Sequence, residues 1–204
     1  MLRPGNVTAA AGAVGILRRL MGLIRGSFPK ARIRVRLDGG FANPELLAFL
    51  DAEAGVEYAV AMAGNAVLNR KAEEAMKVAR LLAGITDQTE HVYGEARYAA
   101  GSWKHERRVI LKAEVVRAEG KAPKDHPRFV ITNMKQSPQW LYEQVYCQRG
   151  EIENRIKELH AMEIDRTSCS LFWANQFRVL LTATAYVLMQ ELRLSAAGTN
   201  CARA

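Results

Sequence analysis

The N-terminal third of the chain alternates between helical and strand-like patterns of hydrophobic side chains. Apolar residues first recur at helical spacing, and Asn6 is the predicted N-cap of this helix. Residues 33–37 then alternate apolar and basic side chains, which predicts a short strand that ends at Asp38. A helix capped by Asn43 and an apolar strand over residues 56–62 follow. This order of strand, helix and strand predicts a parallel pair with a right-handed crossover.

The middle of the chain, residues 64–136, has a different pattern. A helix is predicted near its start, over residues 71–82, and a polar linker over residues 119–127. Between and after them lie short apolar runs typical of strands, at residues 96–98, 107–116 and 128–132. We therefore expect a β-rich insertion.

Two long helices are predicted at the C-terminal end, over residues 139–162 and 171–193. The second has the length to cross a bilayer, but Asn175, Gln176 and Arg178 interrupt it, so we expect a buried helix and no membrane contact. The predicted fold class is mixed α/β. Its expected parts are a core over residues 1–63, the insertion over 64–136, closing helices over 137–195 and a disordered tail over 196–204.

The charge of the chain narrows the classes of partner. Lys and Arg number 29 against 21 Asp and Glu, so the net charge of +8 favours phosphate-bearing polymers. The 3 cysteines form no Cys-x-x-C pair, which argues against a zinc site or a disulfide framework. No leader pattern opens the chain, so the expected compartment is the cytoplasm.

One face of the helix predicted over residues 139–162 carries most of the candidate chemistry. At about 3.6 residues per turn, one polar stripe within an arc of about 80° contains Tyr146, Arg149, Glu153, Lys157 and His160. Asp38 adds a carboxylate at the end of a strand and ahead of a helix, where open α/β sheets place ligand sites.

Each feature also has a simpler interpretation. The stripe is equally typical of a solvated helix face whose ion pairs contribute a few tenths of a kcal/mol. Asp38 is also a typical turn residue before two glycines. Periodicity alone leaves both interpretations open.

Taken together, these residues resemble a known family. Tyr146-x2-Arg149-x3-Glu153 resembles the Tyr-Arg-Glu-Lys signature around the last catalytic acid of insertion-sequence DDE transposases, although His160 occupies the position of the signature Lys. The segment LDGGFA at residues 37–42 resembles the strand that bears the second acid. Similar segments follow the signature, DRTS at residues 165–168 and ANQFR at residues 174–178.

This resemblance implies a partial ribonuclease-H-like fold and a metal-dependent reaction. In the family, two Mg²⁺ or Mn²⁺ ions held by carboxylates activate water and then a DNA 3′ hydroxyl. Asp38 and Glu153 would be metal ligands and catalytic acids here, with Glu151 as the second choice for the latter. The implied partner is double-stranded DNA, both transposon ends and target, whose phosphates would contact Tyr146, Arg149, Lys157 and His160.

The insertion is a second candidate contact with DNA. Lys104, Arg107 and Arg108 belong to a dense charge cluster, and Trp103 precedes it. Stacking of such an aromatic ring on a displaced base is worth roughly 1–3 kcal/mol, although a Trp in the core is the more common case.

The family's first catalytic Asp has no counterpart in this sequence, because the first 37 residues contain no acid. We therefore expect the C-terminal part of a transposase that is inactive by itself. One alternative is a non-catalytic DNA-binding or regulatory fragment that contacts transposon ends, its own copies or intact transposase. Another is an unrelated basic α/β domain whose acids are surface charges.

Overall fold

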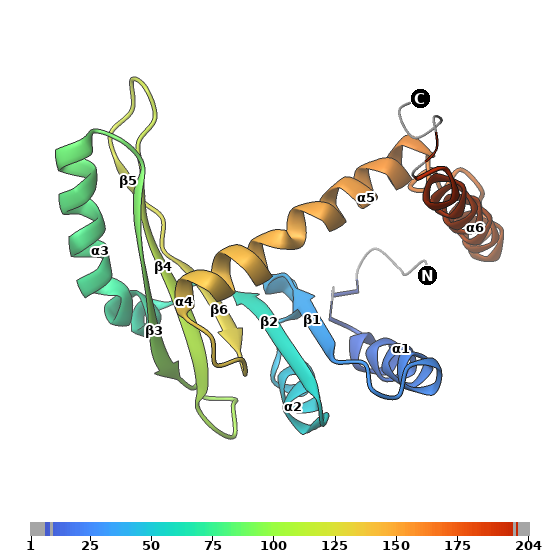
Figure 1. The fold of residues 1–204 in the computed structure, drawn as a ribbon, viewed down its shortest axis with the longest axis horizontal. Helices are drawn as coiled ribbons and strands as arrows, with labels where there is room; N and C mark the ends of the chain where they lie inside the picture. The colour runs from blue at the N-terminus through green and yellow to red at the C-terminus, as the bar shows by residue number, and fades with distance from the viewer. Residues whose placement is uncertain (1–6, 9, 198, 200–204) are drawn as a thin grey trace. The chain divides into compact units, whose positions relative to one another are not determined.

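The computed structural model describes residues 7–8, 10–197 and 199, with the side chains of residues 149–152 left out. The chain divides into two compact units (Figure 1). We call Thr8–Gln148 the sheet unit, and Arg149–Ala204 together with Met1–Val7 the helical unit. The predicted mixed α/β class is confirmed, and the sheet is consistent with a partial ribonuclease-H-like core.

One mixed sheet forms the sheet unit, in the order β1-β2-β6-β4-β3. β1 and β2 are parallel, as predicted, and every other neighbouring pair is antiparallel. The short strand β5 pairs with β4. The strands span Ile33–Leu37 (β1), Val56–Met62 (β2), Glu90–Tyr98 (β3), Arg107–Val116 (β4), Lys124–Asp125 (β5) and Arg128–Thr132 (β6).

The β1-α2-β2 segment folds as its local sequence indicates. A 3₁₀ turn, Gly39–Phe41, follows β1, and α2 spans Pro44–Ala52. The Asn43 side chain caps α2 by accepting a hydrogen bond from the Leu46 backbone N–H at 2.8 Å. Leucines of α2 are fully buried against the sheet, which fixes the helix over the parallel pair.

Helices α1 and α3 differ at their ends from the predicted ones. α1 spans Ala13–Ser27 with Gly12 as its cap, while the predicted cap Asn6 lies outside the described residues. α3 spans Ala66–Thr86 and is longer than predicted. Its start is set by Asn65, whose side chain accepts hydrogen bonds from two backbone N–H groups, both at 3.0 Å.

Hydrophobic residues pack on both faces of the sheet. Helices α1, α2 and α3 supply one core, around Tyr58 and Val60. The opposite face is covered by the segment at residues 138–146, which packs on Ile110 and Val130. Because β3, β4 and β6 are hydrogen-bonded into the same sheet as β1 and β2, the segment expected as an insertion shares this core.

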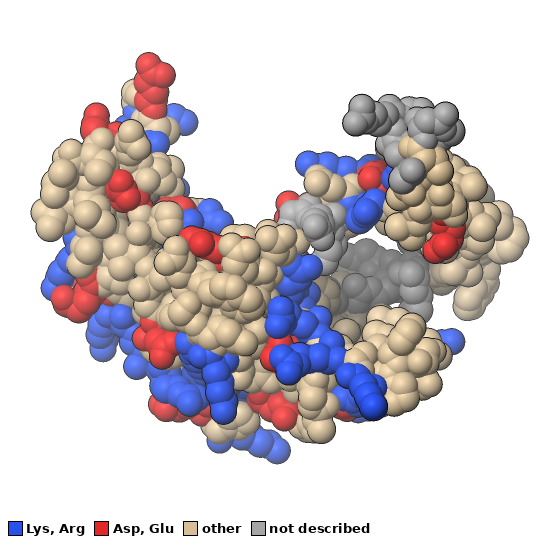
Figure 2. Space-filling view, viewed as in Figure 1, with Lys and Arg blue, Asp and Glu red and all other residues tan. Residues whose placement is uncertain are grey.

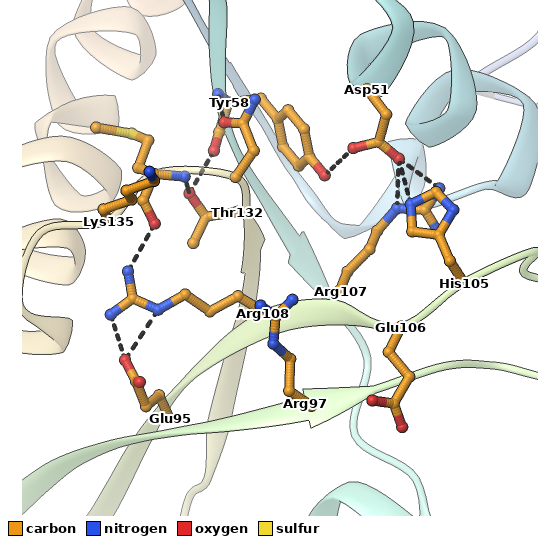
Figure 3. Close-up of a pocket in the computed structure, with 12 residues that line it drawn as sticks. Asp51, Tyr58, Glu95, Arg97, His105, Glu106, Arg107, Arg108, Thr132 and Lys135 are labelled. Atoms are coloured by element: carbon orange, nitrogen blue, oxygen red, sulfur yellow. Dashed lines mark hydrogen bonds and ion pairs between the residues drawn. The ribbon is translucent and has the colours of Figure 1, made fainter.

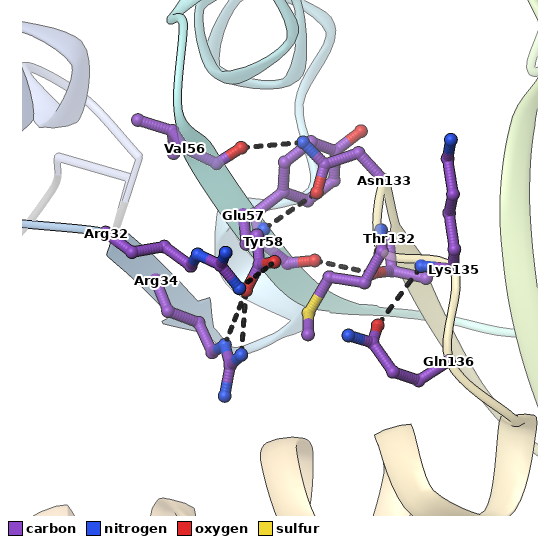
Figure 4. A network of polar contacts seen from close by, with 10 residues as sticks. Arg32, Arg34, Val56, Glu57, Tyr58, Thr132, Asn133, Lys135 and Gln136 are labelled. Carbon is purple, nitrogen blue, oxygen red and sulfur yellow. Dashed lines mark hydrogen bonds and ion pairs between the residues drawn. The ribbon is translucent and has the colours of Figure 1, made fainter.

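Two polar side chains extend the pairing of β2 and β6 beyond the end of β6 (Figure 4). Thr132 Oγ1 donates a hydrogen bond to the Tyr58 carbonyl at 2.7 Å. Asn133 Oδ1 accepts from the Tyr58 N–H at 3.0 Å, and its Nδ2 donates to the Val56 carbonyl at 2.8 Å. The Asn133 side chain therefore gives two backbone groups of β2 the hydrogen bonds that a longer β6 would otherwise provide.

The helical unit contains α5, Gly150–Ala161, and α6, Phe172–Ala196. Glu158 of α5 joins them, because its Oε2 accepts from the Tyr186 hydroxyl at 2.8 Å and from Arg193 at 3.0 Å. The Tyr186 hydroxyl, followed by Arg193, lowers the pKa of Glu158. This carboxylate is thus a structural link between the two helices.

The expectation that residues 171–193 form a buried helix is wrong. Asn175 is the buried residue of α6 among those described, while Trp173, Phe177 and Leu188 are exposed. The reason is that α6 packs on α5 through a narrow set of residues and has no sheet beneath it within its own unit. Within the described part of the chain, no helix is long and apolar enough to cross a membrane.

We predict that Asn133→Ala lowers the free energy of unfolding by about 1–3 kcal/mol, because two buried backbone groups of β2 lose their partner. Urea denaturation monitored by circular dichroism measures this change. Asn69→Ala, an exposed substitution on α3, is the control and should be neutral or slightly stabilising. Equal stability of Asn133→Ala and the wild type would show that the side-chain bridge is dispensable.

Candidate functional site

Asp38 lies directly after β1, at the edge where the parallel strands β1 and β2 end. Its backbone is extended, and its Oδ1 accepts a hydrogen bond from the Gly40 N–H at 2.9 Å. The side chain is exposed and forms no ion pair with any described residue. The turn thus orients the carboxylate through one backbone contact and leaves it accessible to a ligand.

Basic residues of β1 connect the strand to the segment that covers this face of the sheet. Arg36, two residues before Asp38, donates a hydrogen bond from Nη1 to the Val145 carbonyl at 3.0 Å. Arg34 pairs with Glu57 at 2.7 Å (Figure 4). Its guanidinium also lies over the Trp140 ring, 5.9 Å from the ring centroid. These contacts hold residues 138–146 beside the strand that leads to Asp38.

The predicted helix over residues 139–162 is present but irregular. It begins with α4, Pro138–Trp140, and continues as a π-helix over Leu141–Tyr146 and a 3₁₀ turn over Cys147–Arg149 before α5 starts. The 3.6-residue period therefore does not run from Tyr146 to Glu153, and the predicted single stripe needs correction. Wide and narrow turns change the angle per residue, and periodicity read from sequence assumes a constant angle.

The signature residues divide between the two units. Tyr146 belongs to the sheet unit and packs against Tyr142, with ring centroids 5.5 Å apart. Glu153, Lys157 and His160 are exposed on α5 in the helical unit, at spacings that share one helix face. The side chains of Arg149 and Glu151 lie outside the description. The expected approach of Asp38 and Glu153 stays a prediction.

A pocket of about 460 Å³ lies at the other end of the strands from Asp38 (Figure 3). Asp51, at the end of α2, accepts a hydrogen bond from the Tyr58 hydroxyl at 2.7 Å and one from Arg107 Nη2 at 2.6 Å. The His105 ring lies 3.1 Å from the same carboxylate. The Arg107 side chain is only 4% exposed, so Asp51 neutralises a buried cation.

The four residues of the insertion that were expected to contact DNA lie in different environments. Arg107 is buried, and its guanidinium stacks on Trp103, 4.8 Å from the ring centroid. Trp103 also contacts Tyr98 edge-on, which matches the alternative interpretation as a core residue. Arg108 pairs with Glu95 and donates to two loop carbonyls. Lys104 is exposed.

The residues that sequence reasoning missed are Asp51, Tyr58, Arg97 and Lys135. Asp51 and Tyr58 belong to different elements and meet Arg107 only through the fold, so no motif spacing indicates their contact. Arg97 could have been found from the sequence, because Glu95 and Arg97 alternate with the less exposed Ala96 and Tyr98, but the strand there was predicted too short. Among the described residues, no three His, Cys, Asp or Glu side chains form a metal-binding group.

A comparison with known protein families shows the family to which the chain belongs. The family described as "Transposase DDE domain group 1" matches residues 1–204, the whole chain. The chain belongs to this transposase family. The resemblance inferred from the segments around Asp38 and Glu153 is thereby confirmed at the level of the family. No curated protein sequence matches this transposase-family chain.

The folding stability of this transposase domain should depend on pH through Tyr58, which lines the pocket. Burial and the neighbouring Asp51 carboxylate raise the pKa of Tyr58 above its ordinary value. The folded state thus prefers the protonated phenol, so its contribution to stability is complete below the unfolded pKa of about 10 and declines as pH rises beyond it. Tyr58→Phe removes the hydroxyl and keeps the ring.

We predict that Tyr58→Phe lowers the unfolding free energy by about 1 kcal/mol at neutral pH, and that this difference shrinks above about pH 10. Urea denaturation of both proteins at several pH values tests this. Both proteins have the same lysines, so subtracting one curve from the other cancels their titration. A difference that stays constant across this range would contradict the assigned protonation of Tyr58.

Proposed function

We propose that this chain serves the metal-dependent cleavage and strand transfer of transposon DNA ends. Membership in the DDE transposase family supports a role in transposition. The observation that carries the finer proposal is the position of Asp38, an accessible carboxylate at the end of a strand paired in parallel with its neighbour. Open α/β sheets bind ligands at this edge.

The donor set fits a hard divalent cation. The proposed ligands Asp38 and Glu153 are both exposed, and carboxylate oxygens are the donors that Mg²⁺ and Mn²⁺ prefer. Bound metal would supply Lewis-acid stabilisation of the phosphodiester oxygens and a more acidic water. The hydrogen bond from the Gly40 N–H holds the Asp38 carboxylate in one orientation.

Cations near the proposed ligands would hold the DNA. Lys157 follows Glu153 by one turn on α5, and Arg149 precedes it by four residues. His160 lies 3.2 Å from Asp165, so its positive charge when protonated is partly balanced. In this proposal Arg149, Lys157 and Tyr146 contact backbone phosphates of the transposon end, which positions the DNA without reading its sequence.

A second candidate function is DNA binding without cleavage, as a regulatory partner of intact transposase. The net charge of +8 favours it, together with the exposed cations Lys104, Arg97 and Lys135 of the sheet unit. The resemblance assigns only two of the family's three acids to positions in this chain. Cleavage therefore separates the two functions, whereas DNA binding is common to both.

We predict that Asp38→Asn and Glu153→Gln each weaken Mn²⁺ binding at least about tenfold, because each removes a charged ligand of the same ion. Titration calorimetry measures the affinity. Asp38→Asn keeps an oxygen that accepts from Gly40, so the turn is preserved, and Glu74→Gln is the matched control on an exposed helix face.

The double variant shows whether both carboxylates hold one ion. With one shared site, the wild type binds a single ion and Asp38→Asn with Glu153→Gln binds it no more tightly than either single variant. A wild type that binds two ions, with one ion lost in each single variant, would assign the carboxylates to separate sites and overturn the shared metal centre.

We predict that the purified chain does not nick DNA carrying the transposon's own ends in Mg²⁺ or Mn²⁺. The reason is that two-metal chemistry needs both ions about 3.5–4 Å apart, and two carboxylates do not normally fix that geometry. The measurement is strand nicking by gel electrophoresis, with Asp38→Asn run in parallel. Nicking that disappears in Asp38→Asn would mean that an unidentified acid completes the site.

A further inference from the structure

In the pocket at the end of the strands opposite Asp38, the carboxylates do not neutralise every positive side chain. Arg97 of β3 and Arg108 of β4 are direct cross-strand partners, so their side chains leave the same face of the sheet. Like charges in this arrangement are destabilising unless each is neutralised. Glu95 neutralises Arg108, whereas Arg97 is exposed and forms no ion pair with any described residue.

Lys135 adds a second open cation from a loop that the sheet holds in place. Arg108 donates hydrogen bonds to the Met134 carbonyl at 2.6 Å and to the Gln136 carbonyl at 2.9 Å. Both residues adjacent to Lys135 are therefore hydrogen-bonded to β4, which fixes the backbone that carries this lysine. Figure 3 shows Lys135 beside Arg108. The Lys135 ammonium forms no ion pair with the described carboxylates, and its side chain lines the pocket.

Arg107 also lines the pocket, but its side chain is buried. Its Nε and Nη2 are both bonded to Asp51, but its buried Nη1 has no hydrogen-bond partner in the described structure. Carboxylates also line the pocket, and Asp51 and Glu95 are already committed to Arg107 and Arg108. Glu106 lies at the margin and forms no ion pair with Arg97.

We propose that this pocket binds a backbone phosphate of duplex DNA, with Arg97 and Lys135 as its direct contacts. The inference rests on the proposed transposase function and adds a DNA contact away from Asp38. A phosphodiester offers one negative charge and several acceptor oxygens, which match two open cations better than any apolar ligand. Lys and Arg side chains gather along this margin of the sheet unit, below β3 and β4 in the view of Figure 2.

The position of the pocket indicates which phosphate it would hold. In the register of β1 and β2, Asp38 is level with Ala61, the residue after Val60. The pocket begins nearer the start of β2, at Tyr58. This offset along the strand is about 10 Å, or about three base pairs of DNA rise. The pocket would therefore hold DNA that flanks the reacting phosphate and would fix the direction in which the duplex leaves the site.

The test compares Arg97→Ala with Lys135→Ala, as a double variant, against a control with the same loss of charge. The control is Arg70→Ala with Lys71→Ala, two exposed cations of α3. Affinity for a labelled duplex is measured by fluorescence anisotropy over a range of salt concentrations in EDTA. Because EDTA removes metal, failure of the proposed metal centre leaves this result unchanged.

We expect the pocket variant to bind about tenfold more weakly and its slope of log affinity against log salt to be shallower by about two. The control should lose less than about twofold. Equal losses in the two variants would overturn the site, since affinity would then follow net charge alone. Thermal melting of both variants confirms that they fold.

A separate arm with inorganic phosphate distinguishes a DNA contact from a site for a small anion. We expect phosphate to raise the melting temperature of the wild type and not of the pocket variant, while duplex affinity also depends on the pocket. Phosphate binding that the variant abolishes, combined with unchanged duplex affinity, would assign the pocket to a free anion and overturn the proposal.

Discussion

The pairing of β6 between β2 and β4 is the constraint on which the sheet unit depends. β6 has 5 residues, and 4 of them are buried, because helices or the segment at residues 138–146 cover both faces. Its register with β2 on one side and with β4 on the other joins the parallel pair to the long antiparallel hairpin. Removing it would leave two small sheets, each with a solvent-exposed edge.

This register also sets the distance between the two ends of the sheet that carry chemistry. Asp38 lies beyond the last residue of β1, whereas Thr132 and Asn133 close the opposite end by bonding to β2. A shift of one residue in β6 would reverse the faces of its buried side chains and would move Asn133 away from the Tyr58 N–H. The hydrogen bonds of Thr132 and Asn133 therefore protect the register where the strand itself has ended.

The sequence predicted β1, β2, β4 and β6 well because each has an apolar pattern with clear boundaries. The Asn43 and Asn65 caps show how local chemistry sets helix starts, although the second was not used, and α3 was predicted too short. Asp38 was found through its position and its family motif. The buried state of Arg107 was not predictable, because its partner Asp51 lies 56 residues away and only the fold joins them.

The exposed face of α6 and the irregular turn before α5 were not predictable from the spacing of hydrophobic residues. A hydrophobic pattern shows which residues favour burial, and it does not show whether a partner surface is present in the same unit. A 3.6-residue pattern likewise assumes that every turn is α-helical, which fails at Leu141–Tyr146.

The π-helix shows how this segment accommodates one residue more than a regular helix would. In it, the Cys147 N–H bonds to the Tyr142 carbonyl, five residues earlier, where an α-helix would bond four residues earlier. Such a turn is equivalent to an α-helix with one residue inserted. Deleting one residue after Leu141 and before Tyr146 would therefore allow a regular α-helix, while the residues on either side of the turn keep their phase along the helix. Gene variants with a single-codon deletion here would keep every signature residue and change only the local shape of the turn.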